Sequence, residues 1–218
     1  MNLNEKINEI GDKLVVCKLC GKKDHVENSE FIPPRCLYLD PKESKELSCV
    51  VVGINPGQLK AGSREYEAYK ASKNTSKYKA QVDYFENNKG VIRYSKRIDE
   101  LLKSMGLKEN GKGVLWTELC KCQLSDDFQG LPFQTFRRCA GKYLTRELDA
   151  SGDVPVVAVG NQTYTILSFF YPKRAVIGVL HPTGTHVSYD SYIEKVRKLR
   201  PLIKDTISKK ECLWLPYS

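Results

Sequence analysis

The sequence lacks several features that would assign the protein to a specialised class. Its 218 residues contain no run of about 18 apolar residues, so a membrane-spanning helix is not expected. No internal repeat or low-complexity tract occurs, and residues 1–6 lack the apolar core of a signal peptide. We therefore expect a cytoplasmic protein, associated with the nucleoid if the cell is prokaryotic. Hydrophobic residues make up 41% of the chain and charged residues 28%, which is ordinary globular usage and excludes disorder as the main state.

Acidic residues are in short supply. The chain has 26 Asp and Glu against 35 Lys and Arg, which gives a net charge of +9. An excess of this size favours a polyanionic partner such as DNA, RNA or an anionic membrane surface. The alternative is a basic surface that serves only solubility, and charge alone does not separate the two.

Cysteine, by contrast, is abundant, with eight residues in the chain. In a reducing compartment cysteines are metal ligands or buried thiols more often than disulfides. Cys17 and Cys20 form a Cys-x2-Cys pair, and Cys122 and Cys139 lie far downstream. Cys49, Cys120 and Cys212, in apolar runs, are expected to be plain core thiols.

Short apolar, β-branched runs alternate with amphipathic segments along the chain. This alternation is typical of an α/β fold, here a three-layer sandwich around a central, mostly parallel four-stranded sheet. We expect one domain over residues 1–218, with a partly ordered basic and aromatic insertion at 58–90. Asn161 is placed as the N-cap of a helix. The predicted strands are 49–52, 114–116, 154–159 and 175–180, and the predicted helices are 3–14, 92–105, 133–148, 162–170 and 189–208.

Two motifs directly follow predicted strands, where α/β sheets collect functional residues. The first runs Gly53-Ile54-Asn55-Pro56-Gly57, in which two glycines and a proline shape a turn that presents the Asn55 amide. The second runs His181-Pro182-Thr183-Gly184-Thr185-His186, with a histidine at the strand end. Read singly, each is also consistent with an ordinary turn or a structural histidine.

Together, the motifs resemble those of the uracil-DNA glycosylase superfamily. Gly53–Gly57 is spelled as in the mismatch-specific uracil/thymine glycosylases, and His181–Thr183 is closer to the uracil-specific branches. The resemblance implies that Asn55 positions the attacking water and that His181 hydrogen-bonds the departing base. It also implies a base-binding set and a DNA-contacting set. The base-binding set is Gly53, Ile54, Pro56, Gly57, Glu118 and Phe85, and the DNA-contacting set is Lys60, Thr183, Gly184 and His186.

The cysteines resemble those of the iron–sulfur branch of the same superfamily. There, four cysteines hold a structural 4Fe–4S cluster, and the matching residues here are Cys17, Cys20, Cys122 and Cys139. The alternative is zinc, because Cys17 and Cys20 have zinc-knuckle spacing and His25 and Cys36 lie nearby as further ligands.

Two positions depart from the family pattern. In the iron–sulfur branch an asparagine four residues before the third cysteine reads the uracil edge, whereas this chain has Glu118. An ionised carboxylate only accepts hydrogen bonds, so either Glu118 is protonated, the substrate is not simply uracil, or another residue reads the base. After His181, Gly184 and His186 offer no large apolar wedge, so extrusion of the base relies on other loops or on single-stranded substrate.

The insertion mixes tyrosines with lysines, a combination that suits phosphate contacts and base stacking. Phe85, Tyr84 or Tyr94 could supply the aromatic floor for a flipped base; the alternative is a solvated surface whose tyrosines pack on the sheet. The sequence therefore predicts a monomeric, monofunctional DNA glycosylase that acts on uracil or another deaminated base, in single- or double-stranded DNA. The alternatives are a nucleic-acid-binding protein with altered catalysis on the same fold, or a zinc-binding basic module.

Overall fold

The structure is a computed structural model that describes residues 2–20, 26–27, 32–35, 37–72, 76–108, 111–124, 133–183 and 188–217. Its strands are β1 Val26–Glu27, β2 Tyr38–Asp40, β3 Leu47–Gly53, β4 Gly113–Glu118, β5 Gln123–Leu124, β6 Val156–Val159, β7 Val176–Val179 and β8 Cys212–Trp214. Its helices are α1 Leu3–Val15, α2 Arg64–Ala71, α3 Lys77–Asn88, α4 Arg93–Met105, α5 Phe133–Cys139, the π-helical turn Ala140–Leu144, α6 Thr145–Ala150, α7 Asn161–Phe170, α8 Tyr189–Lys198 and α9 Arg200–Lys209.

The central sheet has the strand order β2-β4-β3-β6-β7-β8 and is parallel except for the β2–β4 pair. The predicted α/β class and mostly parallel sheet are confirmed, and all four predicted strands are present as β3, β4, β6 and β7. The sheet has six strands because β2 and β8 extend its two edges. Each edge strand has three residues, too short for a run of apolar residues to identify it.

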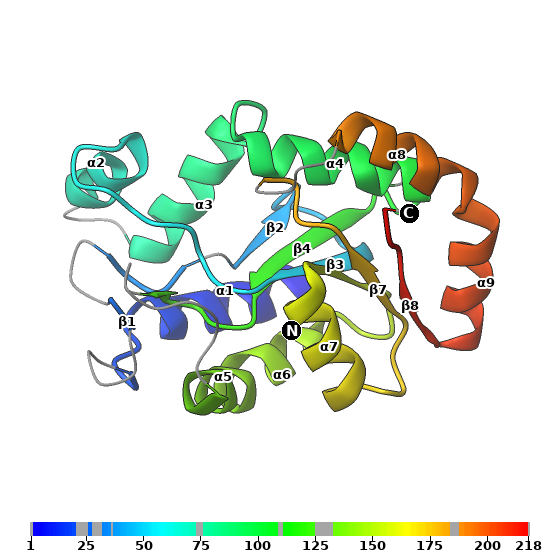
Figure 1. The fold of residues 1–218 in the computed structure, drawn as a ribbon. Coiled ribbons are helices and arrows are strands. Elements are labelled where there is room, and N and C mark those ends of the chain that lie inside the picture. The colour runs from blue at the N-terminus through cyan, green and yellow to red at the C-terminus, as the bar shows by residue number, and fades with distance from the viewer. Residues whose placement is uncertain are drawn as a thin grey trace.

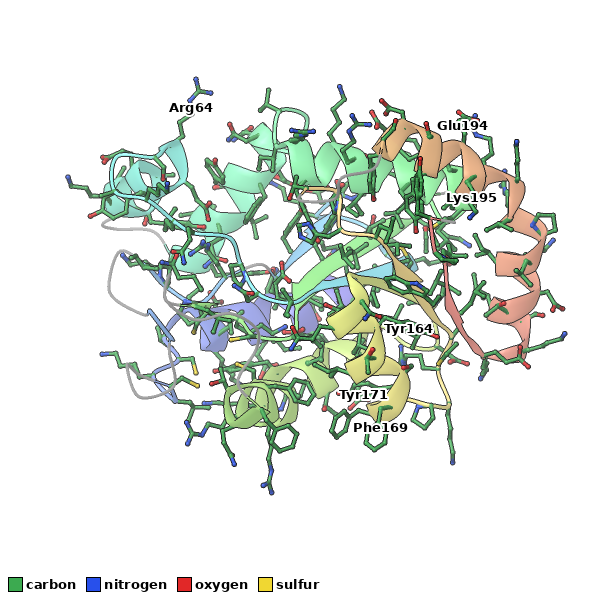
Figure 2. The ribbon with its side chains drawn as sticks, viewed as in Figure 1. Arg64, Tyr164, Phe169, Tyr171, Glu194 and Lys195 are labelled. Atoms are coloured by element: carbon green, nitrogen blue, oxygen red, sulfur yellow. The ribbon has the colours of Figure 1, made fainter. Side chains whose placement is uncertain are left out.

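Helices cover both faces of the sheet, as Figure 1 shows. Alternation along β3 decides which core each residue joins: Cys49 and Val51 pack with α4, α8 and α9, whereas Val50 and Val52 pack with α1, the α5–α6 segment and α7. Figure 2 shows the two outer layers, with Phe169 and Tyr171 at the end of α7 on one side and Glu194 and Lys195 of α8 on the other. None of the helices in the described ranges is both long and apolar enough to cross a membrane.

Two helices lie within the insertion predicted at 58–90, of which residues 73–75 are outside the described residues. These are α2 and α3, and α3 lies against α1, where the Tyr78 ring occupies the space beside Gly11. Tyr69 is fully buried and Tyr78 nearly so. These two tyrosines therefore belong to the interior of the protein, one in each helix of the insertion.

Two smaller predictions about helix ends also need correction. Gly160, not Asn161, precedes α7, with φ of 91°, a conformation that glycine adopts without strain. The helix predicted over 189–208 is two helices: the chain breaks at Leu199, and Pro201 lies in the first turn of α9. Proline suits that position because the first turn does not use its amide hydrogen.

Candidate active site

A cavity of about 390 Å³ lies where β3, β4 and β7 end. Both candidate catalytic residues line it, although Asn55 follows β3 and His181 follows β7. The carboxyl ends of parallel strands meet at one edge of a sheet, which is why segments so distant in sequence share a site. The cavity is lined by Arg35, Tyr38, Gly53, Ile54, Asn55, Gly57, Gln58, Glu65, Tyr84, Phe85, Ile92, Tyr94, Ser95, Trp116, Thr117, Glu118, His181 and Thr183.

The loop that carries Asn55 is fixed by backbone hydrogen bonds to the segment after β4. Leu119 N donates to Gly53 O at 2.9 Å, and Cys120 N donates to Ile54 O at 3.0 Å. The Asn55 amide nitrogen donates to Pro56 O at 2.9 Å, which orients the side chain. Among the described residues no donor reaches the Asn55 amide oxygen, so this atom can accept a hydrogen bond from a water.

His181 is oriented by the residue two positions further on. Its Nδ1 lies 2.5 Å from Thr183 O, and the Tyr94 ring lies 5.4 Å from the imidazole. Thr183 N also donates to Nδ1 at 3.3 Å, so the backbone of Thr183 offers this nitrogen both an acceptor and a donor. When Nδ1 accepts from Thr183 N, the ring proton is on Nε2, which can then donate to a bound group. A donor beside the cavity would stabilise negative charge that develops on that group.

Stacked aromatic rings form one wall of the cavity. Phe85 stacks on Tyr38 with ring centroids 4.8 Å apart, and Tyr38 stacks on Trp116 at 5.7 Å. Tyr38 and Trp116 are buried, while Phe85 is half-buried at the end of the stack. Tyr84 and Tyr94, the other two candidates for an aromatic floor, also line the cavity. The wall suits a flat aromatic ligand. Phe85 is the end ring of the stack, and Tyr38 packs against it.

Glu118 presents its carboxylate to the same cavity. It is the last residue of β4 and pairs in register with Gly53 of β3. A Cβ on Gly53 would lie 2.0 Å from Glu118 Oε2, so the carboxyl group occupies the space that the glycine leaves. The residue is only 8% exposed, which places an acidic group at the wall rather than in solvent.

Arg35 and Gln123 support the cavity, and sequence reasoning did not identify either. The Arg35 guanidinium donates to Gly57 O and to Gln123 Oε1, and it forms an ion pair with Glu65 at 3.1 Å. Gln123 Oε1 also accepts from Leu59 N at 2.9 Å. The local sequence around an arginine in a polar loop does not predict such a role, because its three side-chain partners come from three separate segments.

A buried charged network lies beneath Glu118. Lys121 Nζ donates to Glu147 Oε2 at 2.7 Å, to Glu118 O at 2.6 Å and to Thr117 Oγ1. The Thr117 hydroxyl donates to the same carboxylate oxygen at 2.6 Å. The Lys121 and Glu147 side chains are 1% and 0% exposed. All three ammonium donors are used, which ties the backbone of Glu118 to α6.

The four predicted cluster cysteines gather on the other side of Lys121. The electrostatic neighbours of Cys122 include Cys139, Cys20 and Cys17, and Cys139 is hydrogen-bonded to Cys120 and Cys20. Burial raises the pKa of the Cys122 thiol, and the hydrogen bond with Cys120 is the main cause that raises the pKa of Cys139 to about 12. Cys120 belongs to this group as well, so its prediction as a plain core thiol is incomplete.

The donor set fits an iron–sulfur cluster. A 4Fe–4S cluster takes one thiolate at each of four irons, so its ligands surround a body larger than a single ion. Within the described ranges, no three His, Cys, Asp or Glu side chains are arranged to share one metal ion. The further ligands of the zinc alternative, His25 and Cys36, lie outside the described residues.

The remaining predicted residues divide into three groups. Gly53, Ile54, Gly57 and Thr183 line the cavity, as Asn55, Glu118, Phe85 and His181 do. Pro56 is buried beside the cavity, and Lys60 is exposed on the chain that leads to α2. Gly184 and His186 lie outside the described residues.

The comparisons with known proteins leave the site to be interpreted from its own geometry. No protein-family model matches the chain, and no curated protein matches it.

Proposed function

We propose that the protein is a monofunctional DNA glycosylase that hydrolyses the N-glycosidic bond of a modified base held outside the helix. The observation that carries the proposal is the meeting of Asn55 and His181 at one cavity with a stacked aromatic wall. A base removed from the duplex stack needs a flat apolar surface in place of its neighbours, and the Phe85 ring supplies one.

The reaction would use the two polar residues in different ways. Water held by the Asn55 amide oxygen attacks C1′ of the deoxyribose, and its oxygen forms the new bond to C1′. The C1′–N bond breaks, and its electron pair leaves on the base. One proton of the water ends on the departing base or in solvent. An amide is a weak base, so the rate would come from placing the water and from a hydrogen bond that His181 donates to the leaving group.

Basic side chains around the cavity support a nucleic-acid substrate. Lys60, Arg64 and Lys70 are exposed on the segment that carries α2, and Arg64 points away from the body of the molecule in Figure 2. Arg93 and Lys96 are exposed on α4, whose first turn also contributes Tyr94 to the cavity. Such groups would contact phosphates and make binding weaken as salt rises.

The cysteine group would hold a 4Fe–4S cluster through Cys17, Cys20, Cys122 and Cys139. When bound, the cluster supplies a structural crosslink between the N-terminal segment, the loop after β4 and α5, and it takes no part in the hydrolysis. Cys122 is next to Lys121, so the crosslink would also stabilise the loop that holds Glu118.

Base release from oligonucleotides tests the proposal. The substrates carry one modified base each, beginning with uracil and hypoxanthine, and abasic sites are revealed by alkali. We expect Asn55→Ala and His181→Ala each to slow release by about 10²–10³-fold, the loss typical of one preorganised group. Asn161→Ala is the matched control, because Asn161 is exposed and makes no side-chain cap to α7. Strand cleavage without alkali would contradict the monofunctional proposal. Unchanged release in both site variants would favour a nucleic-acid-binding protein with altered catalysis on the same fold.

A further inference from the structure

We infer that Glu118 selects a base whose edge offers two neighbouring N–H donors, as a modified guanine does, over uracil. The inference rests on the proposed function and names the substrate class of the same cavity. It follows from where the carboxylate is held, from what a carboxylate can bind, and from the size of the cavity.

The structure holds Glu118 rigidly at its position. Its carboxyl group fills the space beside Gly53, and its own carbonyl oxygen accepts from Lys121 Nζ at 2.6 Å. Leu119 N, directly after it, donates to Gly53 O at 2.9 Å. A residue fixed by a neighbouring strand and by a buried lysine does not move aside readily, so a base that enters the cavity meets the carboxylate in place.

The carboxylate and uracil do not match. An ionised carboxylate accepts hydrogen bonds at both oxygens and donates none. The edge of uracil presents an acceptor on each side of one N–H, so at least one carbonyl oxygen would face negative charge. Glu118 Oε2 is enclosed beside Gly53, so contact with a base falls to the rest of the carboxylate. The edge of guanine presents N1–H beside the 2-amino group, so two neighbouring donors would meet a group that only accepts. The Glu118 position thus favours the guanine edge.

The cavity also has room for a two-ring base. Its volume of about 390 Å³ falls within the range of pockets that enclose complete small ligands. Phe85 is the end ring of its stack with Tyr38 and Trp116, and a purine would cover more of the Phe85 face than a pyrimidine. The substrate class is therefore a damaged purine that keeps N1–H and the 2-amino group; damage lowers the cost of extrusion relative to normal guanine.

The test compares base release from single-stranded and duplex oligonucleotides that contain one 8-oxoguanine, guanine, uracil or hypoxanthine. The proteins are wild type, Glu118→Asn, Glu118→Gln, and Glu67→Gln as a control for loss of an exposed carboxylate on α2. We expect wild type to release 8-oxoguanine at least about tenfold faster than uracil. Glu118→Asn should shift this preference toward uracil by about 5- to 150-fold, and Glu67→Gln should leave it unchanged.

Two outcomes of that assay would overturn the inference. Wild type that prefers uracil would show that Glu118 is protonated or does not read the base. An equal loss of release for every base in Glu118→Gln would show that the residue acts in the reaction rather than in selection.

A binding measurement separates failure of the inference from failure of the proposed function. Trp116 and several tyrosines line the cavity, so quenching of protein fluorescence can report the binding of 2′-deoxyguanosine and 2′-deoxyuridine. If wild type releases no base, the glycosylase proposal fails, yet tighter binding of deoxyguanosine that is lost in Glu118→Asn would still support the inference. Equal binding of the two nucleosides would overturn it.

Discussion

The buried Lys121–Glu147 pair allows a stability prediction that can be worked out from the structure. Lys121→Met removes the ammonium group and leaves the Glu147 carboxylate fully buried, with only the Thr117 hydroxyl donating to it. Removing one partner of a buried pair costs about 3–5 kcal/mol, because the remaining charge has lost its compensation. In a chain of this length each kcal/mol lowers the Tm by about 2–4 °C, so the Tm should fall by roughly 6–20 °C.

The double variant Lys121→Met/Glu147→Leu isolates the reason for that loss. Replacing both charges by apolar groups of similar size is often neutral or stabilising, so the double variant should recover most of the Tm that the single variant loses. Lys209→Met is the control, because Lys209 pairs with Asp205 on the exposed face of α9 and its loss should leave the Tm close to that of wild type. Samples are compared at equal metal content, since Lys121 is next to Cys122, one of the proposed cluster ligands.

The measurements are urea unfolding at 25 °C and thermal unfolding followed by circular dichroism. A Lys121→Met variant that loses less than about 1 kcal/mol would refute the reasoning, because the pair would then not be desolvated as the structure shows. A double variant no more stable than the single would refute it as well, since the loss would come from packing rather than from the uncompensated carboxylate.

Two further predictions concern the cavity and the cysteines. Gly53→Ala should displace the Glu118 carboxylate, cost about 1–3 kcal/mol and weaken nucleoside binding. Gly90→Ala should be tolerated, because Gly90 does not line the cavity and nothing lies within 4 Å of its added methyl. The Tm and fluorescence quenching measure both variants, and equal effects would contradict the placement of Glu118. Protein purified without oxygen should be brown with about four irons per chain, and Cys122→Ala should lose the visible absorption; one zinc and no iron in wild type would contradict the cluster.

Much of the architecture could be predicted from local sequence. The Cys49–Val52 run is a strand because its β-branched residues suit a sheet buried on both faces, and residues 93–105 are a helix because Ile98, Leu101, Leu102 and Met105 share one side. Such patterns depend on neighbours within a few residues. The two motifs could likewise be placed at strand ends, and parallel strands then bring Asn55 and His181 to one edge.

The supporting groups of the site could not be predicted in this way. Arg35 contacts Glu65, Gly57 and Gln123, which lie far from it in the chain. Lys121 contacts Glu147 on α6, 26 residues further along the chain. A lysine or an arginine in isolation is far more often solvated than buried, so composition indicates the opposite of what the structure shows. Only the tertiary arrangement supplies the partners that make burial of these charges tolerable.

The sequence by itself determined the class of sheet, the order of its main elements and the placement of Asn55 and His181 just after two strands, because periodicity and turn chemistry are local. Only the tertiary structure decided that the insertion folds as two helices, that Phe85 is supported by a stack of rings, and that Glu118 faces the cavity beside Gly53. Each of those outcomes depends on contacts between residues far apart in the chain, where packing and desolvation rather than local propensity set the free energy.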